Sequence, residues 1–149
     1  GVAKFTNFKT DGSAGHDATF PDADFFLMRV AEAYLNFAEA DARLNGDQTT
    51  DEGTAAINAI RKRAHASTRE DRGYSLSDIC DEWSREFYFE GRRRMDLIRF
   101  NRFGGNVNYN WQWKGGTKEG RNFSKDLNIF AIPTNELTSN KNLIQNPGY

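Results

Sequence analysis

Carboxylates and arginines that could do acid–base chemistry are crowded between residues 81 and 102. Glu82, Glu86 and Glu90 recur every four residues, so a helix would place all three on one face. A glycosidase needs two carboxylates opposed across a cleft of about 5–9.5 Å, which carboxylates stacked on one helix rarely provide. Nearby arginines would also lower the pKa of these carboxyls, whereas a general acid needs a raised pKa. The pattern favours structural ion pairs over catalysis.

The two signs of charge form adjacent blocks in this stretch. Residues 74–90 carry five acidic side chains and one arginine, whereas residues 91–102 carry five arginines and one aspartate. Neighbouring blocks of opposite sign most simply neutralise each other, so we expect ion pairs across Gly91. Anion binding by the arginines is the alternative to this pairing, and catalysis by the glutamates is another. The predicted structural ion-pair cluster consists of Glu82, Glu86, Glu90, Arg92, Arg93, Asp96 and Arg99.

Three aromatic residues, Tyr109, Trp111 and Trp113, alternate with amide side chains just beyond these blocks. In an extended strand this alternation would place the three rings on one side. Flat aromatic faces stack on the C–H faces of a sugar ring, and Asn and Gln side chains can bond its hydroxyls. Alternatively, the rings fold back and cap a helical core. The residues alone favour the packing interpretation, and sugar binding is the competing hypothesis.

Asp22 and Asp24, with Asp11 or Asp17 nearby, could offer oxygen ligands to a hard cation. Their spacing lacks the glycine and the terminal glutamate of a calcium-binding loop, and helix capping explains them more simply. The sequence also lacks a phosphate-binding glycine motif, a nucleophile elbow and a histidine-bearing triad. We therefore predict neither a metal nor another cofactor.

The composition excludes several classes of partner and fold. The chain has 149 residues with 20 Lys+Arg against 21 Asp+Glu, and without a basic excess we expect no binding to nucleic acid. The mean hydropathy is −0.78, and no apolar run approaches the roughly 20 residues of a membrane-spanning helix. The single Cys80 excludes an internal disulfide and a cysteine-based zinc cluster. An apolar fraction of 38% is still compatible with a folded core.

Helices are predicted to position the candidate residues. Apolar side chains recur at i, i+3, i+4 and i+7 in the segment after Pro21, which is the spacing of one helix face. Asp22 or Asp24 is the expected N-cap of this first helix. The Asn45-Gly46 pair is the expected stop, because both residues tolerate the left-handed conformation at a helix end.

Further helical segments follow. A second helix is predicted over about residues 50–65, and it forms a helical hairpin with the first. A third helix begins after Ser75 or Ser77 and ends near Gly91. Residues 92–103 are predicted to continue helically, and the chain then becomes rich in loops. Together these segments predict a mainly α fold.

Four motifs, in this order along the chain, resemble signatures of the SusD/RagB family of outer-membrane lipoproteins. The match covers nearly the whole length, and an ordered set of four is specific. The motifs are Asp24–Leu35 with Ala38–Ala40, Ile57–Ala64, Asp81–Phe100, and Ile129–Pro133 with Asn146–Tyr149.

The resemblance implies a fold and a place in a longer protein. Members of the family are several times longer than this chain, begin with a lipoprotein signal and contain TPR-like helix pairs. The expected fold of residues 1–149 is therefore one mainly α domain of TPR-like helical hairpins with long irregular loops. We expect this domain to be the C-terminal portion of the family fold, with the lipid anchor outside this chain.

The resemblance also implies a function, which is non-enzymatic binding of starch-like or other glycans at the extracellular face of the outer membrane. The bound oligosaccharide would pass to a SusC-like TonB-dependent transporter for nutrient uptake. Tyr109, Trp111 and Trp113 are the aromatics expected near a sugar. In some members of the family, an acidic residue near Asp22 or Asp24 could join a calcium site. A TPR-like protein-interaction module and a glycoside hydrolase are the alternative functions.

Overall fold

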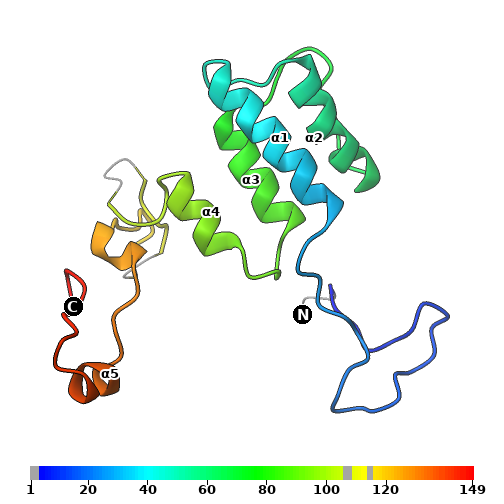
Figure 1. Cartoon of the computed structure of the whole chain (residues 1–149). Coiled ribbons are helices and arrows are strands. Elements are labelled where there is room, and N and C mark those ends of the chain that lie inside the picture. Colours follow the sequence, from blue (N-terminus) through cyan, green and yellow to red (C-terminus); the bar gives the residue numbers. More distant parts are fainter. Residues whose placement is uncertain (1–3, 106–108, 114–115) are drawn as a thin grey trace. The chain divides into compact units, whose positions relative to one another are not determined.

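The computed structural model describes residues 4–105, 109–113 and 116–149 and is mainly helical, as predicted (Figure 1). Among these residues, β structure is confined to three isolated bridges. The chain divides into two compact units, one that ends at Glu90 and one that begins at Gly91. In chain order the helices are α1 (Val30–Leu44), α2 (Asp51–Arg63), α3 (Leu76–Glu86), α4 (Arg93–Arg99), the 3₁₀ helix η2 (Lys125–Asn128) and α5 (Thr134–Ser139).

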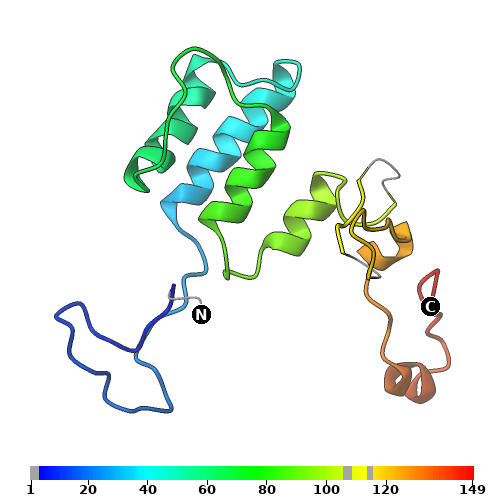
Figure 2. The same cartoon turned by 180° about the vertical axis from the view of Figure 1, so that it is seen from behind.

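Three helices build the core of the first unit. Helix α1 lies between α2 and α3 and packs against both, as the two opposite views show (Figures 1 and 2). Alanines on the inner face of α1 let its neighbours approach closely, and each larger apolar side chain that is fully buried contributes about 1.5–3 kcal/mol. The fully buried apolar side chains are Leu35, Ala38, Ala42, Ile57, Ile79, Cys80 and Trp83.

The starts of α2 and α3 are fixed by local hydrogen bonds. Ser75 is the N-cap of α3 and forms a reciprocal capping box with Asp78, which confirms one of the two predicted caps. Arg69 donates to both carboxylate oxygens of Asp78 at 2.8 and 2.9 Å. These hydrogen bonds hold the pKa of Asp78 well below its usual value. At α2, the Asp41 carboxylate accepts a hydrogen bond from the backbone N–H of Thr50 at 2.7 Å.

Helix α1 begins at Val30, so the prediction of a start near Asp22 or Asp24 was wrong. Its N-cap, Arg29, is extended, with φ −152° and ψ 157°. The apolar side chains at 25–28 are exposed in this structure. A helical pattern becomes a stable helix mainly when its apolar face packs on a partner, and residues 25–28 stay largely exposed, with the Phe25 ring stacked on Phe5.

The second unit is built from short helices, turns and aromatic contacts. Helix α4 ends at Arg99, earlier than the predicted 103, and Asn101 adopts a left-handed backbone with φ 54°. Phe103 meets Phe123 edge to face, with ring centroids 5.0 Å apart. Gly104 is buried at this point, where a Cβ atom would press on the backbone carbonyl of Ser124. Close packing in this unit therefore depends on individual residues rather than on long helix faces.

None of the helices described here is long and apolar enough to cross a membrane.

Candidate functional site

Arg29 is the centre of a dense ion-pair cluster in the first unit. Its Nε and Nη2 atoms donate to the two carboxylate oxygens of Glu90, each at 2.8 Å. Its Nη1 pairs with the Glu86 carboxylate, and Nη2 also donates to the Glu86 backbone carbonyl at 2.6 Å. The guanidinium carbon lies 4.1 Å from the centre of the Phe87 ring. Lys4 pairs with Glu90 as well, so this carboxylate is held by two cations.

A second group of ion pairs links α2 to α3. Arg61 donates to Glu82 at 2.6 Å, and Arg85 on the next turn of α3 donates to the same carboxylate oxygen at 2.6 Å. Arg63 reaches both carboxylate oxygens of Glu86 at 2.7 Å. Glu82 and Glu86 thus join the C-terminal turn of α2 to α3.

The sequence identified these carboxylates but not their partners. We expected pairing across Gly91, and in the structure Glu82, Glu86 and Glu90 each have cationic partners that precede Gly91. These partners are available because α3 packs in the first unit, where Arg29 and the end of α2 face the three carboxylates.

The remaining members of the predicted cluster lie in the second unit. Asp96 is buried and pairs with Arg99 one turn later at 3.1 Å. Arg92 is the N-cap of α4, and Arg93 is its first residue. The seven residues of the predicted cluster are therefore divided between two units.

The electrostatics of Glu90 suit a structural role. Burial would raise the pKa of this carboxyl, but the hydrogen bonds from Arg29 and Lys4 outweigh burial and lower it. A general acid needs the opposite shift, because it must keep its proton near neutral pH. The geometry can therefore tie residues 4 and 29 to the end of α3, and it does not prepare Glu90 to donate a proton.

The aromatic segment of the second unit is partly packed. The Trp111 ring meets Phe103 edge to face at 6.2 Å and Tyr109 edge to face at 5.8 Å. Its Nε1–H donates to the Phe103 carbonyl at 3.2 Å, and its backbone pairs with Arg121 in an isolated bridge. Arg102 lies over the Tyr109 ring at 5.6 Å. Tyr109 and Trp111 therefore have neighbours of their own unit.

Trp113 differs from the other two aromatics. The residue is 66% exposed, and its backbone is left-handed with φ 63°. This conformation ends the extended alternation that was expected to place all three rings on one side. Asn110 and Gln112 are exposed beside the rings, as hydroxyl-binding amides would need to be. Residues 106–108 and 114–115 of the same segment lie outside the described residues.

Asp22 and Asp24 lie in the extended segment before α1 and do not cap it. Asp22 accepts a hydrogen bond from the backbone N–H of His16 at 2.8 Å and pairs with the His16 ring. Asp24 lines a small hollow with Phe5 and Phe25. In the part of the chain that the structure describes, no three or more His, Cys, Asp or Glu side chains gather as a metal site would require.

Sequence reasoning missed Lys4 and Arg29 as members of the ion-pair cluster. Arg29 stands 57 residues before Glu86, so no helical spacing connects them. One sequence feature could have pointed to Arg29: it is the only charged residue among the apolar residues 25–31. A charge in an apolar segment needs a partner when the segment is buried, so an ion pair could have been expected there.

Comparison with known proteins identifies a family and relatives of this chain. The model of one protein family, described as the SusD family, matches residues 1–149. The starch-binding protein SusD of Bacteroides thetaiotaomicron is 45% identical over 148 residues. That alignment covers 99% of this chain and 26% of the relative.

Solved structures agree on the fold. A laminarin-binding SusD-like protein matches with a TM-score of 0.63 and 26% identity, over 96% of this chain and 26% of that one. Surface glycan-binding protein A from Bacteroides uniformis matches with a TM-score of 0.65 and 27% identity, over 82% and 27% of the two chains. A SusD superfamily protein from Parabacteroides distasonis gives a TM-score of 0.69 over 88% of this chain and 28% of that one, and its 24% identity shows the fold alone. This chain thus spans about a quarter of the length of each relative.

Proposed function

The chain belongs to the SusD family, and from this membership we propose that the protein binds glycans without cleaving them. The observation that carries the proposal is the 45% identity to a starch-binding protein across 99% of this chain. Similarity to a laminarin-binding structure supports the broader class of glucose polymers. In this proposal the protein captures an oligosaccharide at the outer face of the outer membrane and passes it to a SusC-like TonB-dependent transporter.

Within this chain, we propose that Trp113 stacks on the sugar and that Tyr109 and Trp111 hold its segment in place. The exposed ring of Trp113 is available to a pyranose, whereas Trp111 is held between Phe103 and Tyr109. Stacking of a flat ring on C–H groups supplies affinity, and amides supply hydroxyl recognition. Neither interaction requires a cofactor.

The carboxylates support binding without catalysis. Glu82, Glu86 and Glu90 each accept hydrogen bonds from cationic side chains of the first unit. A glycosidase needs one carboxyl that keeps its proton and a second one opposed to it. Glu90 fails the first requirement, because the hydrogen bonds from Arg29 and Lys4 outweigh its burial and lower its pKa.

Isothermal titration of the full-length protein with maltoheptaose and with laminarin oligosaccharides tests the proposal. We expect saturable heat with at least one of these glucans and no accumulation of reducing sugar over hours. The absence of heat with every glucan would overturn glycan binding. Release of reducing sugar that Glu86→Gln or Glu90→Gln abolishes in a folded protein would overturn the non-enzymatic assignment.

Trp113→Ala tests the position of the sugar. We expect it to weaken binding about tenfold, which corresponds to about 1.4 kcal/mol and to the loss of one stacking surface. Phe20→Ala is the matched control, because Phe20 is 71% exposed and belongs to the other unit. Equal affinity of the two variants would remove Trp113 from the site while leaving glycan binding by the protein intact.

A further inference from the structure

The turn between α1 and α2 contains the one Asn-Gly pair of the chain, Asn45-Gly46. Asn45 is the C-cap of α1, and Gly46 follows it with a left-handed backbone, φ 64°. Both residues are exposed to solvent. The N–H of Asp47 donates to the Ala42 carbonyl at 2.9 Å, which is the closing hydrogen bond of a Schellman motif. The Asn45–Gly46 peptide bond therefore lies inside a hydrogen-bonded loop at the surface.

An asparagine followed by glycine holds both reactants of spontaneous deamidation. The nucleophile is the backbone nitrogen of Gly46, and the electrophile is the Cγ atom of Asn45. Glycine has no Cβ atom to hinder the attack. None of the residues that the structure describes accepts a hydrogen bond from the Gly46 N–H, and the space where a Cβ atom would lie is empty to 4 Å. The attacking nitrogen is therefore accessible to base from the solvent.

The side chain of Asn45 is a donor to Asp41. Its Nδ2 donates to the Asp41 backbone carbonyl at 2.8 Å and to the Oδ1 atom of the same residue at 3.0 Å. The other carboxylate oxygen of Asp41, Oδ2, accepts the N–H of Thr50 just before α2 at 2.7 Å. Asp41 thus links the end of α1 to the start of α2, and Asn45 helps to hold it.

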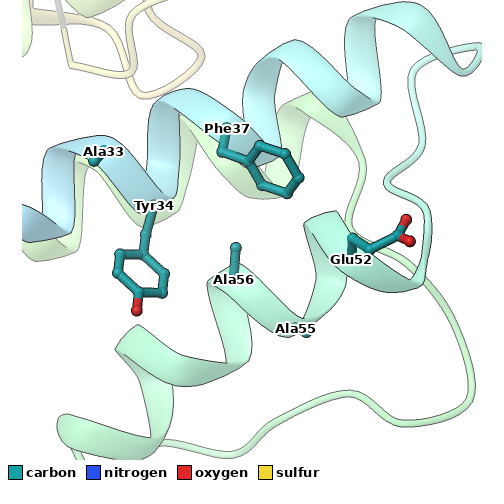
Figure 3. Close-up of a pocket in the computed structure, with 6 residues that line it drawn as sticks. All are labelled: Ala33, Tyr34, Phe37, Glu52, Ala55 and Ala56. Atoms are coloured by element: carbon teal, nitrogen blue, oxygen red, sulfur yellow. The ribbon is translucent and has the colours of Figure 1, made fainter.

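The surroundings of Asn45 are acidic. Asp47 lies in the same turn, and Asp41 faces it from α1. Figure 3 shows Glu52 at the start of α2, with its carboxylate pointing away from the Phe37 ring. A carboxylate at position 45 would add negative charge to this group and to the C-terminal end of α1, where negative charge opposes the helix dipole.

We propose that Asn45 is a site of spontaneous deamidation that weakens the turn between α1 and α2. Base removes the proton of the Gly46 amide nitrogen, which attacks Cγ of Asn45 to form a cyclic succinimide. Nδ2 leaves as ammonia after it takes a proton from water. Water then adds to one of the two imide carbonyls. Cleavage of the Cγ–N bond gives aspartate, whereas cleavage between the backbone carbonyl carbon and the nitrogen gives isoaspartate, and neither route needs an oxidant or a reductant.

Both products change the contacts of the turn. Each replaces the Asn45 amide by a carboxylate, so the two hydrogen bonds to Asp41 are lost and like charges come close together. Isoaspartate also inserts the Cβ atom into the main chain, inside the loop that the hydrogen bond from Asp47 to Ala42 closes. The modification therefore loosens the end of α1 and the link to α2.

Incubation of the full-length protein in mildly alkaline buffer at physiological temperature tests the site. Peptide mapping by mass spectrometry, together with methylation by an isoaspartyl methyltransferase, measures the products at each asparagine. Asn36 is the internal control, because it is exposed on the same helix but is followed by Phe37, whose N–H bonds within the helix. We expect conversion at Asn45 to be at least about tenfold faster than at Asn36. Equal or slower conversion at Asn45 would overturn the proposal.

Gly46→Ala tests the mechanism. It should slow conversion at Asn45 at least about fivefold, because the added Cβ atom hinders the attacking nitrogen. Unchanged hydrogen exchange in α3 would show that the variant is folded. Unchanged conversion at Asn45 in the folded variant would overturn attack by the Gly46 nitrogen.

Asn45→Asp tests the effect on the turn, because it reproduces one of the two products. Hydrogen exchange at the backbone amides of residues 45–50 should become about fivefold faster or more, the change that the loss of one hydrogen bond brings. Asn45→Ser is the matched control, because it removes the amide without adding a charge, and its exchange should change less. Equal exchange in the two variants would overturn the weakening of the turn by the new carboxylate.

Discussion

The two units of the chain are stabilised in different ways. The first has three helices of 11 to 15 residues around fully buried side chains such as Leu35 and Trp83. The second has helices of four to seven residues and is held largely by aromatic contacts and by side chains that bond backbone groups. Long helices can share one apolar core, whereas short ones need a specific contact at each turn. Substitutions should therefore act through burial in the first unit and through individual contacts in the second.

Arg94 illustrates the second kind of stabilisation. Its guanidinium carbon lies 3.9 Å from the centre of the Phe130 ring and 4.9 Å from that of Phe103. The same group donates to the Leu127 carbonyl at 2.8 Å. Gln145 acts similarly, because it bonds both the N–H and the carbonyl of Ile132.

The largest expected difference in the free energy of unfolding is between alanine substitutions of two tryptophans, one from each unit. Trp83 is fully buried, its ring centre lies 5.1 Å from that of Phe87 with the rings tilted, and its Nε1–H donates to Glu39 at 3.0 Å. Trp83→Ala should lower the free energy of unfolding by about 3–5 kcal/mol in urea denaturation, because it leaves a cavity. Trp113→Ala, at an exposed position, should change it by less than about 0.5 kcal/mol. Similar losses for both would contradict the contrast between the units.

The next largest change in the free energy of unfolding is expected when Arg29, the cation at the centre of the first unit's ion-pair cluster, is removed. Arg29→Ala should lower the free energy of unfolding by about 1–3 kcal/mol. Breaking a fully buried ion pair costs about 3–5 kcal/mol. The loss should be smaller here because Lys4 and Arg63 still pair with Glu90 and Glu86. Arg63→Ala is the control, since Arg63 binds Glu86 but its side chain is 63% exposed. Its removal should cost at most about 1 kcal/mol. If thermal unfolding shows Arg63 to matter more than Arg29, the cluster is centred elsewhere.

In the second unit, Arg94→Lys should have a smaller effect, about 0.5–2 kcal/mol. Lysine keeps the charge but loses the planar group that stacks on Phe103 and Phe130. Hydrogen exchange at backbone amides of residues 125–130 should become faster, whereas exchange in α2 and α3 should not change. Unchanged exchange at 125–130 would show that another contact orders this segment.

Acid should weaken the first unit through Asp78. The pKa of the Asp78 carboxyl is lower in the folded protein than in the unfolded chain, where it is about 3.9. Asp78 therefore stabilises the fold fully above the unfolded pKa, and this contribution is lost as the pH falls through the folded pKa. We therefore expect a plateau of stability above about pH 5 and a decline below about pH 4. Asp78→Asn should flatten the decline in a pH series of urea denaturation. A decline of unchanged steepness would assign it to other carboxyls.

The smallest expected effect is that of chelation. Asp22 already accepts hydrogen bonds from His16, and the described residues assemble no metal site. EDTA should therefore leave both the thermal unfolding temperature and the heat of glycan binding unchanged. A loss of affinity that Ca²⁺ restores, and that Asp22→Asn or Asp24→Asn removes, would establish a calcium site instead.

The sequence predicted the first unit better than the second, for physical reasons. Helix α2 and the start of α3 appear where predicted, because apolar spacing and the Ser75 cap are local signals that burial reinforces. The end of α3 was predicted too late, since the helix stops at Glu86 rather than near Gly91 and Glu90 lies beyond it. The start of α1 was misplaced because spacing alone does not show whether a face finds a partner. In the site, the glutamates were identifiable from their spacing, but Arg29 was not, because its contact depends on the fold. The stacked position of Arg94 has no periodic signal at all.

The burial of Cys80 has a practical consequence. It is the single cysteine of the chain and is fully buried in α3. A thiol reagent can reach it only when the core opens, so its rate of modification in native buffer measures how often the first unit unfolds. The chain thus contains an intrinsic reporter of its own opening, and no label needs to be introduced to read it.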